Sequence, residues 1–159
     1  MSRVIDAVIF DLDGVLVDSQ PAALKATIDT LAEYGIDLTD SEVREQVGGG
    51  TRKYLRFFLE KELDLDQVDE CIGKATDRKN NLQMGYTDRV ALLLLAKRIL
   101  IRLNDNGYSI ALAAMSARNV GDRILDYHKF EDYFNVIMTT GDLVNRKPDL
   151  QYLGKRLIN

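Results

Sequence analysis

Two aspartates, Asp11 and Asp13, stand two positions apart where a short apolar run ends. Apart from one aspartate, the run over residues 4–10 has the length and composition of a strand. Gly14 follows directly and lets the chain turn sharply. One carboxylate of such a pair can attack a phosphorus atom while the other moves a proton. The pattern favours phosphoryl transfer through an aspartyl-phosphate, and the plainer alternative is an acidic turn.

Two later polar residues can serve the same chemistry. Ser116 follows a predicted strand over residues 110–115, and Lys147 lies in the loop after a predicted strand over residues 136–139. Parallel sheets place their ligand sites at the carboxyl ends of strands, so we expect both residues beside Asp11. A lysine and a hydroxyl donor offset the negative charge of a phosphoryl group that a carboxylate attacks.

Composition limits the class of protein. The 159-residue chain is 46% hydrophobic and 29% charged, and its net charge of −4 gives no nucleic-acid footprint. A single cysteine, Cys71, cannot form an internal disulfide. The sequence starts without a signal-peptide pattern, and the apolar run over residues 90–95 is too short to span a bilayer. These features predict a cytoplasmic protein without a nucleic-acid or membrane partner.

The periodicity of apolar residues divides the chain. Residues 18–84 carry only helical patterns and are expected to form an inserted helical domain. Residues 1–17 and 85–159 alternate strand and helix patterns, including a largely buried helix over residues 88–103 and a last helix from Pro148. The sequence therefore predicts an α/β fold, with a Rossmann-like parallel sheet of three strands and an all-helical insert.

The string from Phe10 to Val15, followed in order by Ser116 and the triplet Lys147-Pro148-Asp149, resembles the first three motifs of the haloacid dehalogenase superfamily. This resemblance implies that Asp11 is the nucleophile and Asp13 the general acid and base. It also implies that Ser116 and Lys147 hold the phosphoryl group. A magnesium ion would be bound by the Asp11 carboxylate and the Asp13 main-chain oxygen.

The helical insert resembles the cap of the β-phosphoglucomutase-like branch, which closes over the site and selects the substrate. Gly50-Thr51-Arg52 is similar to the cap loop whose arginine grips a distal phosphate, and arginine suits bidentate phosphate binding. For this arginine, a solvated position at a helix start is an equal alternative. The implied substrate-binding residues are Arg52, Ala117, Arg118 and Asn119.

The position of the second motif has two solutions. Aligning Arg118 and Asn119 with the phosphoglucomutase branch would put Met115 at the hydroxyl position, which removes a hydrogen-bond donor. We favour Ser116, because a shift of one residue is easily accommodated at the end of a strand. Residues 20–23 also lack the histidine that mutases carry in the first cap helix, which favours a phosphatase.

The sequence departs from the family pattern after Asp149, where no further aspartate or glutamate occurs. The fourth motif and the C-terminal strands are therefore expected to be missing, which would leave the first strand as an uncovered edge able to pair with a second copy. The predicted function is a magnesium-dependent phosphatase of small phosphorylated metabolites. The alternatives are a hexose phosphate mutase and an inactive, truncated phosphate-binding relative. A receiver domain is disfavoured, because the insert between Asp11 and Ser116 is too long for that fold.

Overall fold

The computed structural model describes residues 5–46, 50–140 and 142, and the chain forms two compact units. One unit joins residues 1–19 to residues 90–159 and holds the sheets. The other unit spans residues 20–89, and the regular elements of its described part are all helices. The sequence analysis placed the two boundaries after residues 17 and 84.

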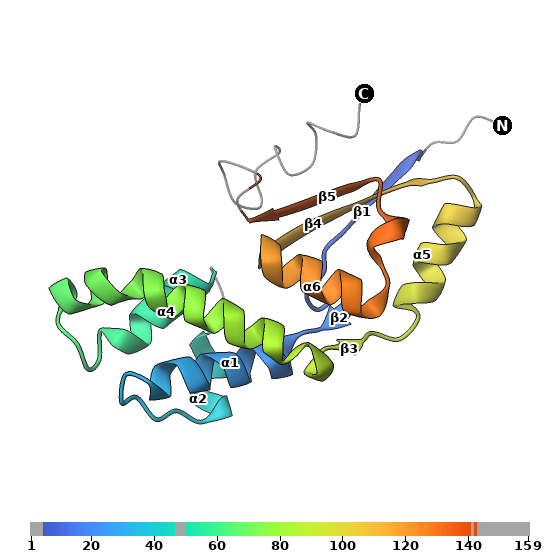
Figure 1. Cartoon of the computed structure of the whole chain (residues 1–159). Helices are drawn as coiled ribbons and strands as arrows, with labels where there is room; N and C mark the ends of the chain where they lie inside the picture. The colour runs from blue at the N-terminus through green and yellow to red at the C-terminus, as the bar shows by residue number, and fades with distance from the viewer. Residues whose placement is uncertain (1–4, 47–49, 141, 143–159) are drawn as a thin grey trace. The chain divides into compact units, whose positions relative to one another are not determined.

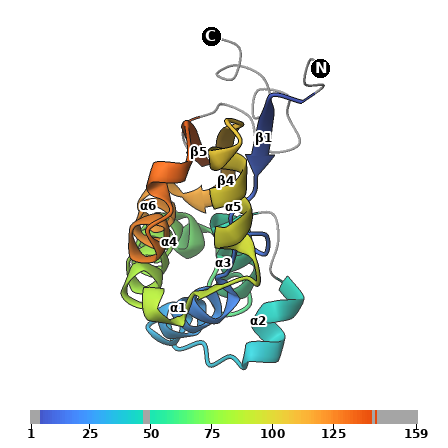
Figure 2. The ribbon, with the colours of Figure 1, turned by 90° about the vertical axis from the view of Figure 1, so that its right-hand side faces the viewer.

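A parallel three-stranded sheet organises the first unit. Its strands are β1 (Ala7–Phe10), β4 (Ser109–Ala117) and β5 (Val136–Thr140), and β4 lies between the other two (Figures 1 and 2). Phe10 pairs with Leu112, which in turn pairs with Ile137. The central strand is buried from Ile110 to Ala114, as expected where a parallel strand is covered on both faces. The predicted parallel α/β fold is confirmed.

Two helices of this unit pack against β4. They are α5 (Ala96–Asp105) and α6 (Arg118–His128), and α6 also contacts β5. Each helix buries one apolar stripe, represented by Leu100 in α5 and by Ile124 in α6. A short 3-10 turn, η2 (Glu131–Tyr133), leads into β5, and Phe130 before it is fully buried.

The predicted helix over residues 88–103 is wrong in its first half. A 3-10 turn, η1 (Thr87–Arg89), is followed by strand β3 (Ala91–Leu92), which pairs antiparallel with β2 (Val17–Asp18). Leu95 adopts a left-handed backbone with φ of 71°, which an α-helix cannot continue through, so α5 begins after it. The segment is also less buried than predicted, since Leu94 is 91% exposed.

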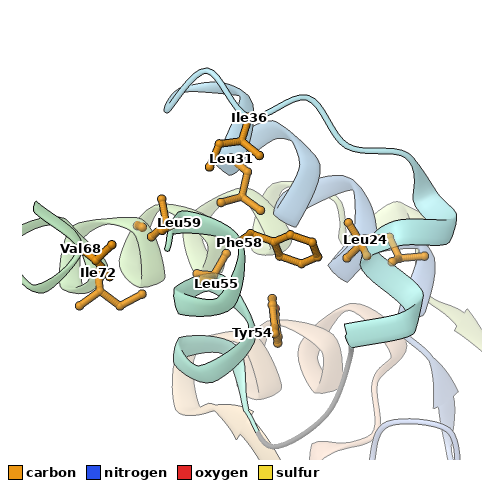
Figure 3. Close-up of a cluster of buried hydrophobic side chains, with 11 residues drawn as sticks. Leu24, Leu31, Ile36, Tyr54, Leu55, Phe58, Leu59, Val68 and Ile72 are labelled. Atoms are coloured by element: carbon orange, nitrogen blue, oxygen red, sulfur yellow. The ribbon is translucent and has the colours of Figure 1, made fainter. Parts of the chain in front are cut away.

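The second unit is built from four α-helices and η1. The α-helices are α1 (Gln20–Ala32), α2 (Asp40–Gln46), α3 (Thr51–Leu59) and α4 (Leu65–Gly85). Phe58 lies in the middle of their apolar core, with Leu24 and Leu55 on either side (Figure 3). The remaining buried members of this core are Leu31, Ile36, Val43, Tyr54, Leu59, Val68, Ile72 and Ala75.

Side-chain caps fix where two of these helices start. Asp64 accepts the backbone N–H of Gln67 at 2.9 Å, and the Gln67 side chain accepts the backbone N–H of Asp64, which forms a capping box before α4. Thr39 and Glu42 pair in the same manner before α2. Within the part of the chain that the structure describes, no helix combines the length and apolarity needed to cross a membrane.

Candidate active site

The predicted carboxylates follow β1 in a tight turn. Gly14 has a positive φ of 75°, and its N–H donates to the carbonyl of Val17 at 2.8 Å. Leu12 is fully buried and anchors the turn, while Asp13 on its other side is exposed. Asp11 is half-buried, and its Oδ1 accepts the Leu12 N–H at 2.8 Å. The buried leucine therefore holds two aspartates on either side of it at the end of the strand.

Two serine hydroxyls bind the two oxygens of the Asp13 carboxylate. Ser116 Oγ donates to Asp13 Oδ2 at 2.5 Å, and Ser19 Oγ donates to Asp13 Oδ1. Ser116 is the last residue but one of β4 and Ser19 follows β2, so three segments of the first unit meet at this carboxylate. The structure thus brings together Asp13, which precedes the helical insert in the sequence, and Ser116, which follows it.

The alternation of side chains in β4, which also carries a bulge here, accounts for Ser116 rather than Met115 facing Asp13. Ala113 pairs with Met138 and Ala117 pairs with Thr140, so residues 114–116 of β4 face only Thr139 of β5. Side chains alternate along a strand, and Met115 packs with Ala113 and Met138 in an apolar cluster. Ser116 consequently points to the other side, toward the carboxylate.

The start of α6 follows Ser116 directly. The N-cap residue, Ala117, has no side chain that can cap the helix, so the site adjoins backbone N–H groups of the first turn. Asn119 Oδ1 accepts the N–H of Val120 at 3.0 Å. Arg118 donates to Asp122 at 2.9 Å and to Asp142 at 3.4 Å. The guanidinium of Arg118 is therefore held by two carboxylates beside this helix end.

Asp142 is a site neighbour to which the sequence analysis gave no role. Its Oδ2 accepts both the N–H of Thr139 at 2.7 Å and the hydroxyl of Thr139 at 2.9 Å. Burial opposes ionisation, but the two bonds from Thr139 and the nearby Arg118 outweigh it and lower the pKa of Asp142. Asp142 follows β5, and its charged carboxylate thus fixes the position of Arg118 in α6.

Two other predicted site residues are Arg52, which belongs to the helical unit, and Lys147. Arg52 is an exposed residue of α3, in the helical unit, where Gly50 with φ of 95° precedes the helix. Lys147 lies outside the described residues. Sequence reasoning missed the contact of Ser19 with Asp13, because it placed this residue in the helical insert over residues 18–84. The only sign in the sequence was a hydroxyl six positions after Asp13. This spacing indicates a contact only when the chain turns between Asp13 and strand β2, and the sequence did not predict this strand.

Magnesium ligands were predicted at Asp11 and Asp13. Within residues 5–46, 50–140 and 142, no group of three or more histidine, cysteine, aspartate or glutamate side chains is arranged to hold a metal ion. Mg²⁺ commonly keeps several water molecules and uses one or two carboxylates together with substrate phosphates. The oxygen donors after β1 fit such a sparsely coordinated ion.

Comparison with known proteins places the chain in a family. The profile of the haloacid dehalogenase-like hydrolase family matches residues 8–158. Phosphoglycolate phosphatase 1 of Pseudomonas aeruginosa is 33% identical over 147 residues, which cover 89% of this chain. The match covers 53% of that relative, so the chain spans about half of its length.

Solved structures show the same fold. A predicted phosphoglycolate phosphatase from Haemophilus somnus superposes with a TM-score of 0.80 at 19% identity, covering 94% of this chain and 68% of that one. A β-phosphoglucomutase from Clostridium difficile gives a TM-score of 0.78 at 26% identity with the same coverages. The chain belongs to the haloacid dehalogenase-like hydrolase family, as its motifs predicted.

Proposed function

We propose that this chain carries the catalytic machinery of a magnesium-dependent phosphatase that hydrolyses small phosphorylated metabolites. The observation that carries the proposal is the hydrogen bond from the Ser116 hydroxyl to Asp13. Asp13 lies two residues after Asp11 in the sequence. Nucleophile, proton carrier and hydroxyl donor then all stand at the carboxyl ends of β1 and β4. Family membership and the phosphatase named among the relatives support the same chemistry.

The proposed reaction has two steps. In the first, a carboxylate oxygen of Asp11 attacks phosphorus, the ester P–O bond breaks, and Asp13 gives a proton to the departing oxygen. In the second, Asp13 takes a proton from water, whose oxygen attacks the phosphorus of the aspartyl-phosphate. Inorganic phosphate leaves, and Asp11 returns as a free carboxylate.

Charge stabilisation is assigned to the residues around this pair. Ser116 Oγ and the backbone N–H groups at the start of α6 are suited to the phosphoryl oxygens. Mg²⁺, when bound by the Asp11 carboxylate and the Asp13 main-chain oxygen, would neutralise part of the charge on the phosphate. Lys147 keeps its predicted role as a further phosphoryl ligand.

The helical unit is proposed to act as a cap that selects the substrate. Arg52 fits a distal anionic group of the substrate, because it is exposed and follows a glycine-containing loop. Arg118 and Asn119 remain candidates beside the phosphoryl site. The proposed compartment is the cytoplasm, where a single unpaired cysteine is unexceptional. Pairing of a second copy along β1 also stays a prediction.

The decisive test is release of inorganic phosphate from a general phosphomonoester in the presence of MgCl₂. Asp11→Asn should abolish release, because the amide cannot attack phosphorus. Asp105→Asn, which makes the same charge change at the end of α5, should leave the rate unchanged. Activity that survives Asp11→Asn would remove this residue from the nucleophile role.

A mutase is the second candidate, favoured by the fold and 26% identity of the Clostridium difficile β-phosphoglucomutase. Interconversion of glucose 1-phosphate and glucose 6-phosphate with a bisphosphate primer would distinguish it from a phosphatase. Steady release of phosphate without interconversion favours hydrolysis. Uptake of one phosphoryl group per chain from a small phosphodonor, without turnover, would identify a phosphate-binding relative.

A further inference from the structure

The Ser116 hydroxyl has two possible hydrogen-bond acceptors and only one proton to donate. It donates that proton to Asp13 Oδ2 at 2.5 Å in the structure. Its proposed catalytic task is to donate to a phosphoryl oxygen. A serine hydroxyl carries a single O–H, so it cannot satisfy both acceptors at the same time.

We infer that the phosphoryl group and Asp13 compete for this hydroxyl, so that the arrival of phosphate releases Asp13 Oδ2 for proton transfer. This inference rests on the proposed function, because it assigns Ser116 to the phosphate. Before phosphate binds, both oxygens of the Asp13 carboxylate are occupied by serine hydroxyls. Afterwards Oδ2 is free to take up a proton from the solvent, which it passes to the departing oxygen in the first step, and to take a proton from the attacking water in the second.

The two serines differ in a way that suits one fixed and one exchangeable contact. Ser19 is 7% exposed, and its hydroxyl stays on Oδ1 to keep the carboxylate oriented. Ser116 is only partly buried at the end of β4. A serine side chain has three staggered positions about its Cα–Cβ bond, so its hydroxyl can turn without any movement of the backbone.

The backbone next to Ser116 is anchored, although Ser116 itself has no paired residue on β5. Thr140 Oγ1 donates to the carbonyl of Met115 at 2.6 Å, which anchors the residue just before it. The bulge leaves residues 114–116 opposite Thr139 alone, so Ser116 has no cross-strand partner in the register of the sheet. The exchange therefore needs a rotation of one hydroxyl and no change in the fold.

A double-mutant cycle on phosphate binding tests the competition without requiring turnover. Binding of orthophosphate in MgCl₂ would be measured by calorimetry for the wild-type chain, Ser116→Ala, Asp13→Ala and the double variant. In the wild type, phosphate gains a hydrogen bond only by breaking the one to Asp13. Ser116→Ala should therefore weaken binding by less than about 3-fold in the wild type and by about 10-fold or more in the Asp13→Ala background.

The cycle cancels the repulsion between phosphate and the Asp13 carboxylate, because that repulsion is the same with or without Ser116. Ser116→Thr, which keeps a hydroxyl, should bind phosphate as the wild type does in both backgrounds. Ser109→Ala, at the other end of β4, is the matched control and should have no effect in either. Thermal melting of each variant establishes that it is folded.

The outcomes separate the inference from the function on which it rests. Equal losses in the two backgrounds overturn the competition and leave Ser116 as an ordinary phosphate ligand. No loss in either background removes Ser116 from the phosphate site and overturns the inference with it. Absence of phosphate binding by the wild-type chain counts against the proposed function as well.

Discussion

The two units differ in what their central residues do. In the helical unit the central residue is Phe58, which is 1% exposed and surrounded by other apolar side chains. At the end of β1 the central residue is Asp13, an exposed carboxylate held by two hydroxyls. Removal of an apolar group from a packed core costs stability, whereas a change at an exposed carboxylate leaves the packing intact. The contrast predicts that stability and phosphate release can be lost independently in this chain, by substitutions in different units.

Among the variants that compare the two units, Asp13→Asn should give the largest effect, and this effect should fall on the rate. An amide can still accept a hydrogen bond from Ser19, but it cannot carry a proton between the ester and water. Phosphate release should fall by roughly 10²–10⁴-fold, the usual contribution of general acid–base catalysis. Steady-state assays at several pH values measure this loss. A melting temperature that falls as steeply as the rate would show that Asp13 is needed for folding rather than chemistry.

Phe58→Ala should give the largest effect on stability. Deletion of a fully buried phenylalanine costs about 3–5 kcal/mol, a large part of the stability of a small domain. Phe57→Ala is the comparison variant, since that neighbour is 41% exposed and packs edge-on against Phe58, and it should cost less, about 1–2 kcal/mol. Urea unfolding followed by circular dichroism compares the two. Similar losses for both variants would contradict the assigned core.

His128 gives the smallest effect and sharpens the comparison inside the first unit. Its Nε2 is buried and has no hydrogen-bond partner among the described residues, unlike the oxygens of Asp13. Burial lowers the pKa of His128 below its ordinary value near 6.5, and a hydrogen bond with the Val90 backbone opposes this in part. The folded state therefore favours the neutral ring.

The sign of the pH dependence follows from this lowered pKa. Above pH 6.5 the ring is neutral in the folded and unfolded chains, so it has no effect on stability. As the pH falls below 6.5, the unfolded chain binds the proton first and the folded state loses stability. His128→Phe should flatten the fall in melting temperature between pH 7.5 and 5.5. An unchanged slope would assign the acid sensitivity to other groups.

The sequence was sufficient for those features that depend on local pattern. The end of β1 was recognisable because an apolar run stops at Asp11 and Gly14 allows the turn. The alternation of strand and helix patterns predicted the parallel sheet, and the order of motifs predicted the family. Ser116 was favoured over Met115 on the grounds that a strand end tolerates a shift, and the alternation of side chains along β4 supplies the physical reason for their orientation.

The errors arose where tertiary pairing overrides an apolar pattern. Residues 90–95 have the composition of a buried helix, yet Ala91 and Leu92 pair with β2, and Leu95 turns the chain before α5. Strands of two residues leave no periodicity to detect. The contact from Ser19 to Asp13 depends on that same pairing, so no reading of neighbouring residues in the sequence would have revealed it.

The alternation of side chains in β4 also makes the site sensitive to the length of one short segment. Met115 and Ser116 are consecutive and point to opposite sides of the sheet. Loss of a single residue between Ala113 and Met115 would exchange their directions, bringing a thioether to the carboxylate and burying the hydroxyl in the apolar layer. The number of residues in this strand therefore determines which side chain reaches the site, so a deletion here disrupts the site more than most substitutions do.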